Sequence, residues 1–330
     1  MKRPFSYIAG TGHAVPAKVV TNHDIAAMGV DTNDEWIVER TGIRQRHICE
    51  PDESLASLCA KASQQAMARA GVQPGEIDVI IVGTASPDHL LPSQAVEVQQ
   101  ALGASRAAAF DVASACSGWL YGAIVGDSMI ASGSADTVLV IGAEKLSAIV
   151  DWTDRNTCIL FADGAGATVL RRAKGEKREK GILSTFMRSD GALSELLWRP
   201  AGGGAEKYSP DAPGRACIQM AGREVFKHAV RSMAEATDRA LDSARITAAD
   251  VDLLIPHQAN VRIIEATAKH AGISMDKVFV NVDRFGNTSA ASIPIALNDA
   301  MEQGRIREGS TVLFAAFGAG FTWGSLVARF

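Results

Sequence analysis

The chain has 330 residues, of which 47% are hydrophobic and 21% are charged, so it is long enough for one large or two medium domains with a sizeable core. Its formal net charge of -4 argues against nucleic acid as a general partner. The five cysteines are an odd number without the close spacing of a zinc site or a disulfide scaffold, which favours a reducing compartment and no metal.

The N-terminus carries basic residues but no long apolar segment of the kind that a signal peptide contains. No later segment approaches the apolar length needed to span a bilayer. We therefore expect a cytoplasmic protein that does not enter a membrane.

An internal repeat becomes visible when residues 54–144 are aligned with residues 225–320. The strongest matches are residues 70–81 with 244–255 and residues 137–143 with 311–317, and both pairs have the same offset in the sequence. Strands that are apolar throughout and alternate with helices indicate parallel sheets covered on both faces. We therefore expect an α/β fold of two pseudo-symmetric β/α halves that pack face to face.

The charged segment RRAKGEKREK, residues 171–180, is most simply a solvated connection between the two halves. We predict an N-terminal half of residues 1–174 and a C-terminal half of residues 175–330.

Cys116 follows an apolar segment that reads as a buried strand ending at Val112. The residues after it predict a helix rich in small side chains, with Gly133 as the stop signal. The partial positive charge of a helix N-terminus favours a thiolate, so Cys116 is a candidate nucleophile. The alternative is an inert buried thiol, which is common in apolar segments.

His257 and Asn287 are the candidate partners of this cysteine. The strand at residues 251–255 leads into His257, and the carboxyl ends of strands are where open α/β sheets place their sites. Asn287 occupies a turn before a second helix that is rich in Ala and Ser. The alternatives are a hydrogen-bonded core histidine and an asparagine that caps a helix.

The repeat relates the turn at Cys116 to a turn in the second half. Residues 110–112 align with residues 280–282, which places Cys116 opposite Gly286–Asn287. Because the symmetry brings matching strand ends and helix starts toward one centre, we expect Cys116, His257 and Asn287 to converge.

A papain-like protease also has Cys, His and Asn in this order, and the separation of Cys116 and His257 fits the spacing of roughly 130 to 150 residues in that family. The second cysteine of the protease signature is absent after Cys116, which also lies far from the N-terminus. Repeated buried β/α units also fit that family poorly, so we set the protease interpretation aside.

Taken together, the chain resembles the β-ketoacyl-acyl carrier protein synthase III family, the thiolase-fold condensing enzymes of bacterial fatty acid initiation. The likeness covers nearly the whole sequence. It rests on ordered motifs at residues 10–12 (GTG), 31–37 (DTNDEWI), 40–44 (RTGIR), the Cys116 turn, 154–155 (DR), 163–167 (DGAGA), 257–260 (HQAN), 286–292 (GNTSAAS) and 317–324 (FGAGFTWG).

The resemblance implies a layered αβαβα fold and an acyltransferase activity. Cys116 would take an acyl group, usually acetyl, from acyl-CoA as a thioester. Malonyl-acyl carrier protein would then lose CO2, and its carbanion would attack the acyl-enzyme to give 3-oxoacyl-acyl carrier protein. His257 and Asn287 would donate hydrogen bonds to the developing enolate. The backbone amides of Cys116 and Ala319 would form the oxyanion site for acyl transfer, although many relatives have Gly where this chain has Ala319.

The resemblance also assigns residues to the substrates, with CoA as a substrate and no cofactor. The CoA-binding residues would be Thr32, Trp36, Arg40, Arg155, Arg223 and Asn260. Trp36 would stack on adenine, while Arg40 and Arg155 would contact the nucleotide end. Arg223 stands where well-known relatives have Asn, so the contact there is altered. A packed surface tryptophan and ordinary surface arginines are the alternative.

The carrier protein is acidic, and Lys227, Arg262 and Lys269 would form a cationic face for it. An ordinary solvated helix face is the alternative. Leu91 aligns with a residue that, in relatives, closes the acyl pocket across a homodimer, where many have Phe. The smaller Leu91 would admit a primer longer than acetyl.

Two further functional hypotheses stay open at this stage. One is a related condensing or acyl-transfer enzyme of secondary metabolism that uses an unusual acyl-CoA. The other is a non-catalytic protein that binds acyl-CoA or the carrier protein, against which the intact Cys, His and Asn argue.

Overall fold

Two mixed β-sheets form the framework of the fold in the computed structural model, which describes residues 5–174 and 180–330. The first sheet has the strand order β1-β7-β6-β4-β5 and the second has the order β11-β12-β13-β8. The strands of the first are β1 (Ser6–Ala14), β4 (Val79–Gly83), β5 (Ala108–Val112), β6 (Thr137–Lys145) and β7 (Asp163–Arg172). The strands of the second are β8 (Gly181–Ser189), β11 (Leu253–Pro256), β12 (Thr311–Gly318) and β13 (Thr322–Arg329).

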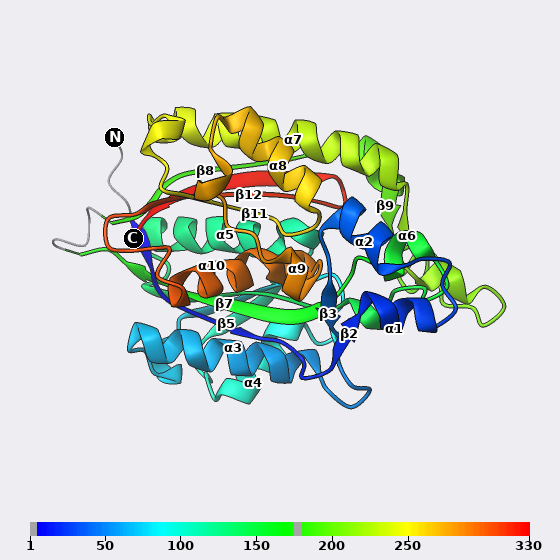
Figure 1. Cartoon of the computed structure of the whole chain (residues 1–330). Coiled ribbons are helices and arrows are strands. Elements are labelled where there is room, and N and C mark those ends of the chain that lie inside the picture. The colour runs from blue at the N-terminus through cyan, green and yellow to red at the C-terminus, as the bar shows by residue number, and fades with distance from the viewer. Residues whose placement is uncertain (1–4, 175–179) are drawn as a thin grey trace.

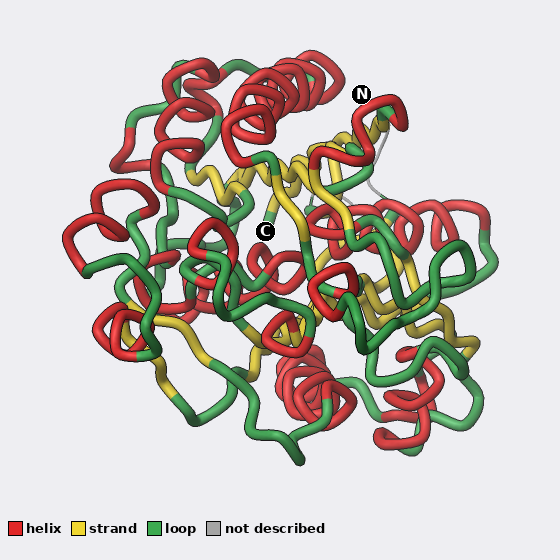
Figure 2. Tube along the Cα trace, turned by 90° about the vertical axis from the view of Figure 1, so that its right-hand side faces the viewer, coloured by secondary structure: helices red, strands yellow, loops and turns green. Residues whose placement is uncertain are grey.

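Helices cover both faces of each sheet and complete five layers (Figure 1). The outer helices α3 (Leu55–Ala70) and α4 (Gln94–Leu102) pack on the first sheet, and α7 (Gly222–Ala244) and α8 (Val261–Ala271) pack on the second. Between the sheets lie α5 (Gly118–Ser132) and α10 (Ser292–Glu302). Figure 2 shows the strand layers alternating with helices in the view turned by 90°. The expected layered αβαβα fold is confirmed.

Most of the smaller elements gather at one end of the stack, on the right of Figure 1. They are β2 (Val19–Thr21), β3 (Gln45–His47), β9 (Leu197–Trp198), α1 (Asn22–Ala27), α2 (Asp34–Thr41) and α6 (Arg155–Cys158). Strand β10 (Gln219–Met220) pairs with β9, and α9 (Val282–Phe285) contacts β3.

The sheets are mixed rather than parallel, which corrects the expectation from the sequence. In the first sheet β4 is parallel to β5 and β6, whereas β7 is antiparallel to β6 and to β1. The second sheet repeats this pattern, because β11 is parallel to β12 and β13 is antiparallel to β12 and β8. Helices also cover both faces of the antiparallel strands, so the sequences of these strands are largely apolar, as those of parallel strands are. The sequence pattern therefore did not distinguish the two directions.

The repeat is visible in the backbone, but the sequence alignment misplaced the partner of Cys116. Ala115 and Ser289 both have positive φ, at 45° and 48°, and each begins a short 3-10 turn that leads into α5 or α10. Their separation in the sequence equals the offset of the matched segments, so the counterpart of Cys116 is Ala290 and not Gly286–Asn287.

An insertion before the second turn explains the error. Ile80 pairs with Ala109 in the first sheet, and its counterpart Leu254 pairs with Val278 in a single bridge. From Ala109 the chain reaches Ala115 after six residues, whereas from Val278 it reaches Ser289 only after eleven. Helix α9 occupies the extra length.

The predicted end of the helix after Cys116 is confirmed, since Gly133 caps α5 in the left-handed conformation. The predicted boundary between residues 174 and 175 adjoins residues 175–179, which lie outside the described part of the chain. The division into two halves at that point stays a prediction.

Candidate functional site

A cavity of about 110 Å³ brings together the three residues that the sequence singled out, because Cys116, His257 and Asn287 all line it. Its remaining wall is mostly apolar and includes Leu197, Met220, Val225, Phe226, Met233 and Phe317. A thiol, an imidazole and a carboxamide therefore meet in a largely apolar chamber.

Cys116 lies in the 3-10 turn Ala115–Ser117, just before the first residue of α5, and is only 9% exposed. Burial, together with the charge of Glu144, raises the pKa of its thiol to about 12. A hydrogen bond with the Ser289 side chain lowers the pKa. The helix N-terminus was expected to lower the pKa of Cys116, but burial has the larger effect because it removes the water that would solvate a thiolate.

His257 follows β11, and its backbone N–H donates to the Ala315 carbonyl at 2.8 Å. Burial lowers the pKa of the imidazole to about 4, so the ring is neutral near pH 7. Nδ1 lies 2.6 Å from Oγ of Ser292, which also accepts a hydrogen bond from the Gln258 N–H at 3.3 Å. When the serine hydroxyl donates to Nδ1, the imidazole proton lies on Nε2, which makes Nε2–H a donor.

Asn287 is held by the backbone on both sides. Its N–H donates to the Leu160 carbonyl at 2.9 Å, and its own carbonyl accepts from the Ala162 N–H at 3.0 Å. The side-chain oxygen accepts from the Ser289 N–H at 2.9 Å, which fixes the orientation of the carboxamide. With Oδ1 occupied in this way, the Nδ2–H₂ group is the part of the side chain left to act as a donor.

The end of β12 lies directly against the Cys116 turn. A Cβ on Gly318 would be 2.7 Å from the backbone nitrogen of Cys116, so only glycine allows this approach. Ala319 is the next residue, and it lies outside the residues that line the cavity.

The residues expected at the nucleotide end of CoA form one group beside the cavity. The guanidinium carbons of Arg40 and Arg155 lie 4.6 and 4.8 Å from the centre of the Trp36 ring. Asn260 connects this group to the cavity, because it lines the cavity and donates to the Arg40 carbonyl at 2.9 Å. The hydroxyl of Thr32 is buried and has no partner within the described residues.

The remaining cationic residues are exposed, and two of them flank cavity residues. Arg223 follows Gly222, which lines the cavity at the start of α7. The guanidinium carbon of Arg262 lies 5.7 Å from the ring centre of Phe226, another cavity residue.

The other two predicted cations are less closely tied to the cavity. Lys227 forms an ion pair with Glu224 at 2.8 Å. Lys269 is in the last turn of α8, seven residues after Arg262, and does not line the cavity. Leu91 also does not line the cavity, and its side chain is 88% exposed.

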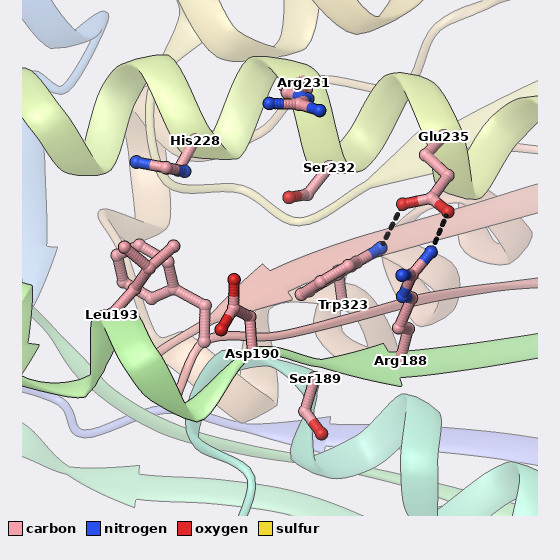
Figure 3. Close-up of a pocket in the computed structure, with 10 residues that line it drawn as sticks. Arg188, Ser189, Asp190, Leu193, His228, Arg231, Ser232, Glu235 and Trp323 are labelled. Carbon is pink, nitrogen blue, oxygen red and sulfur yellow. Dashed lines mark hydrogen bonds and ion pairs between the residues drawn. The ribbon is translucent and has the colours of Figure 1, made fainter.

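A larger hollow of about 680 Å³ lies between α7 and the end of β8 (Figure 3). Its polar lining consists of Arg188, Ser189, Asp190, His228, Arg231, Ser232 and Glu235. Glu235 accepts hydrogen bonds from Arg188 at 2.8 Å and from Trp323 at 3.1 Å. None of the site residues predicted from the sequence lines this hollow, so the smaller cavity is the candidate site.

Three polar residues beside the predicted site are not among the residues that the sequence predicts. Ser292 holds His257, Ser289 contacts Cys116, and Glu144 lies 2.9 Å from the Ser289 hydroxyl. A signal for Glu144 was present, because a carboxylate in an otherwise apolar strand needs a reason to be buried.

Two family models match the chain. Residues 110–191 match "3-Oxoacyl-[acyl-carrier-protein (ACP)] synthase III", and residues 241–330 match the C-terminal model of the same family. Among curated relatives, the beta-ketoacyl-[acyl-carrier-protein] synthase III of Symbiobacterium thermophilum is 50% identical over 324 residues, with 98% of this chain and 97% of the relative covered. That of Xanthomonas campestris pv. campestris is 50% identical over 329 residues, with 100% and 99% covered.

Solved structures give the same result. The 3-oxoacyl-[acyl-carrier-protein] synthase III of Aquifex aeolicus superposes with a TM-score of 0.91 at 45% identity, over 98% of this chain and 100% of that one. The priming β-ketosynthase from the R1128 polyketide pathway superposes with a TM-score of 0.92 at 33% identity, over 99% and 96%. In the described part of the chain, no helix is long and apolar enough to cross a membrane.

Proposed function

This chain belongs to the β-ketoacyl-[acyl-carrier-protein] synthase III family of acyltransferases, which condense acyl-CoA with malonyl-acyl carrier protein to initiate fatty acid synthesis, and we propose that Cys116, His257 and Asn287 catalyse that reaction here. The observation that carries the proposal is the small cavity onto which these three side chains converge.

In the first half-reaction, the Cys116 sulfur attacks the carbonyl carbon of acyl-CoA, and CoA leaves as the acyl group becomes a thioester of Cys116. Negative charge develops on the carbonyl oxygen during this attack. The backbone N–H groups of Cys116 and Ala319 stabilise that charge, and the close approach of Gly318 to Cys116 supports the pairing of these two amides.

In the second half-reaction, malonyl-acyl carrier protein loses CO2, and the resulting carbanion attacks the acyl carbon and releases Cys116. The enolate oxygen formed on decarboxylation needs hydrogen-bond donors. His257 offers Nε2–H because Ser292 occupies Nδ1, and Asn287 offers Nδ2–H₂ because the Ser289 N–H occupies Oδ1. Both donors are uncharged, so neither needs a proton from solvent.

CoA enters past the group formed by Trp36, Arg40 and Arg155. The adenine ring takes the place of a guanidinium on Trp36, because a base stacks on indole as well as an arginine does. The displaced arginine and the exposed Arg223 are then free to contact the CoA phosphates. Thr32 supplies a buried hydroxyl, and Asn260 lies where the pantetheine arm enters the cavity.

The acidic carrier protein docks on the exposed face formed by Lys227, Arg262 and Lys269. Arg262 and Lys269 are seven residues apart on α8 and therefore project from the same side of that helix. Lys227 contributes less, because Glu224 already neutralises it. Such a face speeds and orients docking despite the net charge of -4.

The enzyme works as a homodimer in which Leu91 closes the partner's acyl pocket. An exposed apolar residue is suited to burial against a second copy, and Leu90 beside it is also 75% exposed. Strand β5 lies at the edge of its sheet and offers a further pairing surface. A leucine at this gate admits primers longer than acetyl, and the five free cysteines suit the reducing cytoplasm.

Mass spectrometry tests the nucleophile directly. After mixing with acetyl-CoA, we expect one acetyl group per chain on the peptide that contains Cys116, and no adduct in Cys116→Ala. An intact protein that gives no adduct on Cys116 contradicts the proposal.

The pathway is tested by CO2 release and product mass. Malonyl-acyl carrier protein and malonyl-CoA are offered as competing extenders with a panel of acyl-CoA primers. A fatty acid initiation enzyme uses the carrier-bound extender with short primers. Exclusive use of an unusual primer would favour a role in secondary metabolism, such as the one named for the R1128 priming ketosynthase.

A further inference from the structure

Glu144 is a fully buried carboxylate beside the nucleophile, at the end of β6. Its Oε2 accepts from the Ala85 N–H at 3.0 Å, from Thr84 at 3.3 Å and from the Ser86 hydroxyl. Its Oε1 accepts from the Ser289 hydroxyl at 2.9 Å. Among the described residues, this carboxylate has hydrogen-bond donors but no ion-pair partner, and burial raises its pKa. A carboxylate kept this far from water costs free energy and needs a function.

Ser289 joins this carboxylate to the nucleophile. Its hydroxyl donates to Glu144 at 2.9 Å, and its interaction with the Cys116 thiol lowers the pKa of that thiol. Ser289 comes from the turn that is the symmetry counterpart of the Cys116 turn, and the two turns pack against each other. The repeat therefore places a hydroxyl between a thiol and a carboxylate. A hydroxyl can accept one proton while it donates another, so Ser289 can pass a proton between its two partners.

We propose that Glu144, acting through Ser289, takes the proton of Cys116 during acyl transfer and returns it when the sulfur leaves in condensation. The inference rests on the proposed role of Cys116 as the acyl carrier. In the forward direction the S–H bond breaks as the proton moves to Ser289 Oγ, and the proton of Ser289 moves to Glu144 Oε1. One negative charge thereby moves from the carboxylate to the sulfur.

Two features of the site favour this direction of transfer. The charge of Glu144 opposes ionisation of Cys116, and protonation of the carboxylate removes that repulsion. After transfer the Ser289 hydroxyl donates to the thiolate, which then lies at the start of α5 where an anion is stabilised. Glu144 keeps the proton within the site until the Cys116 thiolate is released again.

His257 is thus left to act as a donor to the enolate, because its hydrogen bond to Ser292 occupies Nδ1. Cys59, a fully buried thiol on α3, also interacts electrostatically with Glu144, and its pKa is raised well above its usual value. Cys59 therefore stays protonated and does not compete for the proton.

The test compares Ser289→Ala with Ser86→Ala. Both substitutions remove one hydroxyl donor from Glu144, but only Ser289 also contacts Cys116. Single-turnover acetylation of Cys116 by acetyl-CoA is followed by intact mass across the pH range. Decarboxylation of malonyl-acyl carrier protein is measured on the same samples. We expect Ser289→Ala to slow acetylation about 100-fold, the lower end of what a positioned acid or base contributes, while Ser86→Ala changes it little.

The pH dependence and a second substitution separate a relay from a structural effect. The relay predicts that acetylation in Ser289→Ala rises with pH as hydroxide replaces the carboxylate, while decarboxylation stays close to that of the unchanged protein. Glu144→Gln should show the same rise. Equal acetylation rates in Ser289→Ala and the unchanged protein overturn the relay, and so does a parallel loss of both activities. Absence of any acetyl adduct in the unchanged protein overturns the proposed function instead.

Discussion

The neutral imidazole of His257 is the feature of the site whose removal has the most predictable effect. With a pKa of about 4, only about one molecule in a thousand carries an imidazolium at pH 7. His257 therefore stabilises the enolate by donating a hydrogen bond and not by its charge. Removing one such donor typically costs about 100- to 1000-fold in rate, which is about 3 to 4 kcal/mol of transition-state stabilisation. His257→Ala should slow decarboxylation of malonyl-acyl carrier protein by that factor.

The assay is CO2 release from malonyl-acyl carrier protein in a Cys116→Ser background, in which acyl transfer is removed. We expect decarboxylation to survive Cys116→Ser in part, because it depends on His257 and Asn287. Between about pH 5.5 and pH 8 the rate should show no inflection from His257, since its pKa lies below that range. An inflection near pH 6.5 that disappears in His257→Ala would refute the neutral donor. In protein that keeps Cys116, equal slowing of Cys116 acetylation and of decarboxylation by His257→Ala would also refute the division of roles.

Three further outcomes are expected. Trp36→Ala should raise the KM for acetyl-CoA by a factor that corresponds to about 1 to 3 kcal/mol, the contribution of base stacking. The KM for acetyl-pantetheine, which has no adenine, should stay unchanged. An equal rise for both thioesters would contradict adenine stacking. Gly318→Ala should slow acetylation of Cys116, because the added Cβ would lie 2.7 Å from its backbone nitrogen, and wild-type kinetics would contradict this contact. The pKa values of His257 and His13 are lowered by burial, so the unfolded chain binds protons that the folded chain excludes. The free energy of unfolding is therefore highest above pH 6.5 and falls as the pH drops toward 4, and His257 accounts for about 3 kcal/mol of this decrease. Urea unfolding that is independent of pH in this window would contradict this linkage.

The sequence predicted the parts of the site that depend on local patterns. The apolar patterns predicted strands that end shortly before Cys116 and His257, and β5 and β11 do end at Val112 and Pro256. A strand end fixes where the next residues emerge from a sheet. The constant offset between the matched segments predicted a repeated β/α arrangement, and the two sheets have the same pattern of parallel and antiparallel strands. Fold and family both followed from these patterns and the ordered motifs.

Other features depend on contacts between residues far apart in the chain, and the sequence could not reveal them. The direction of β7 is set by its neighbours, since a strand covered on both faces reads the same in either direction. The counterpart of Cys116 was misplaced because the extra turn α9 adds length without a matching motif. The raised pKa of Cys116 comes from burial in the folded chain, which no local pattern records.

Covalent catalysis by Cys116 is tested most directly by a chase of the acyl-enzyme. Protein carrying a labelled acetyl group on Cys116 is separated from acetyl-CoA and mixed with malonyl-acyl carrier protein, and the label and CO2 are followed together. We expect the label to leave Cys116 and to appear in 3-oxobutyryl-acyl carrier protein as CO2 is released in equal amount. Label that stays on Cys116, or that is lost only as free acetate while CO2 is released, would contradict it.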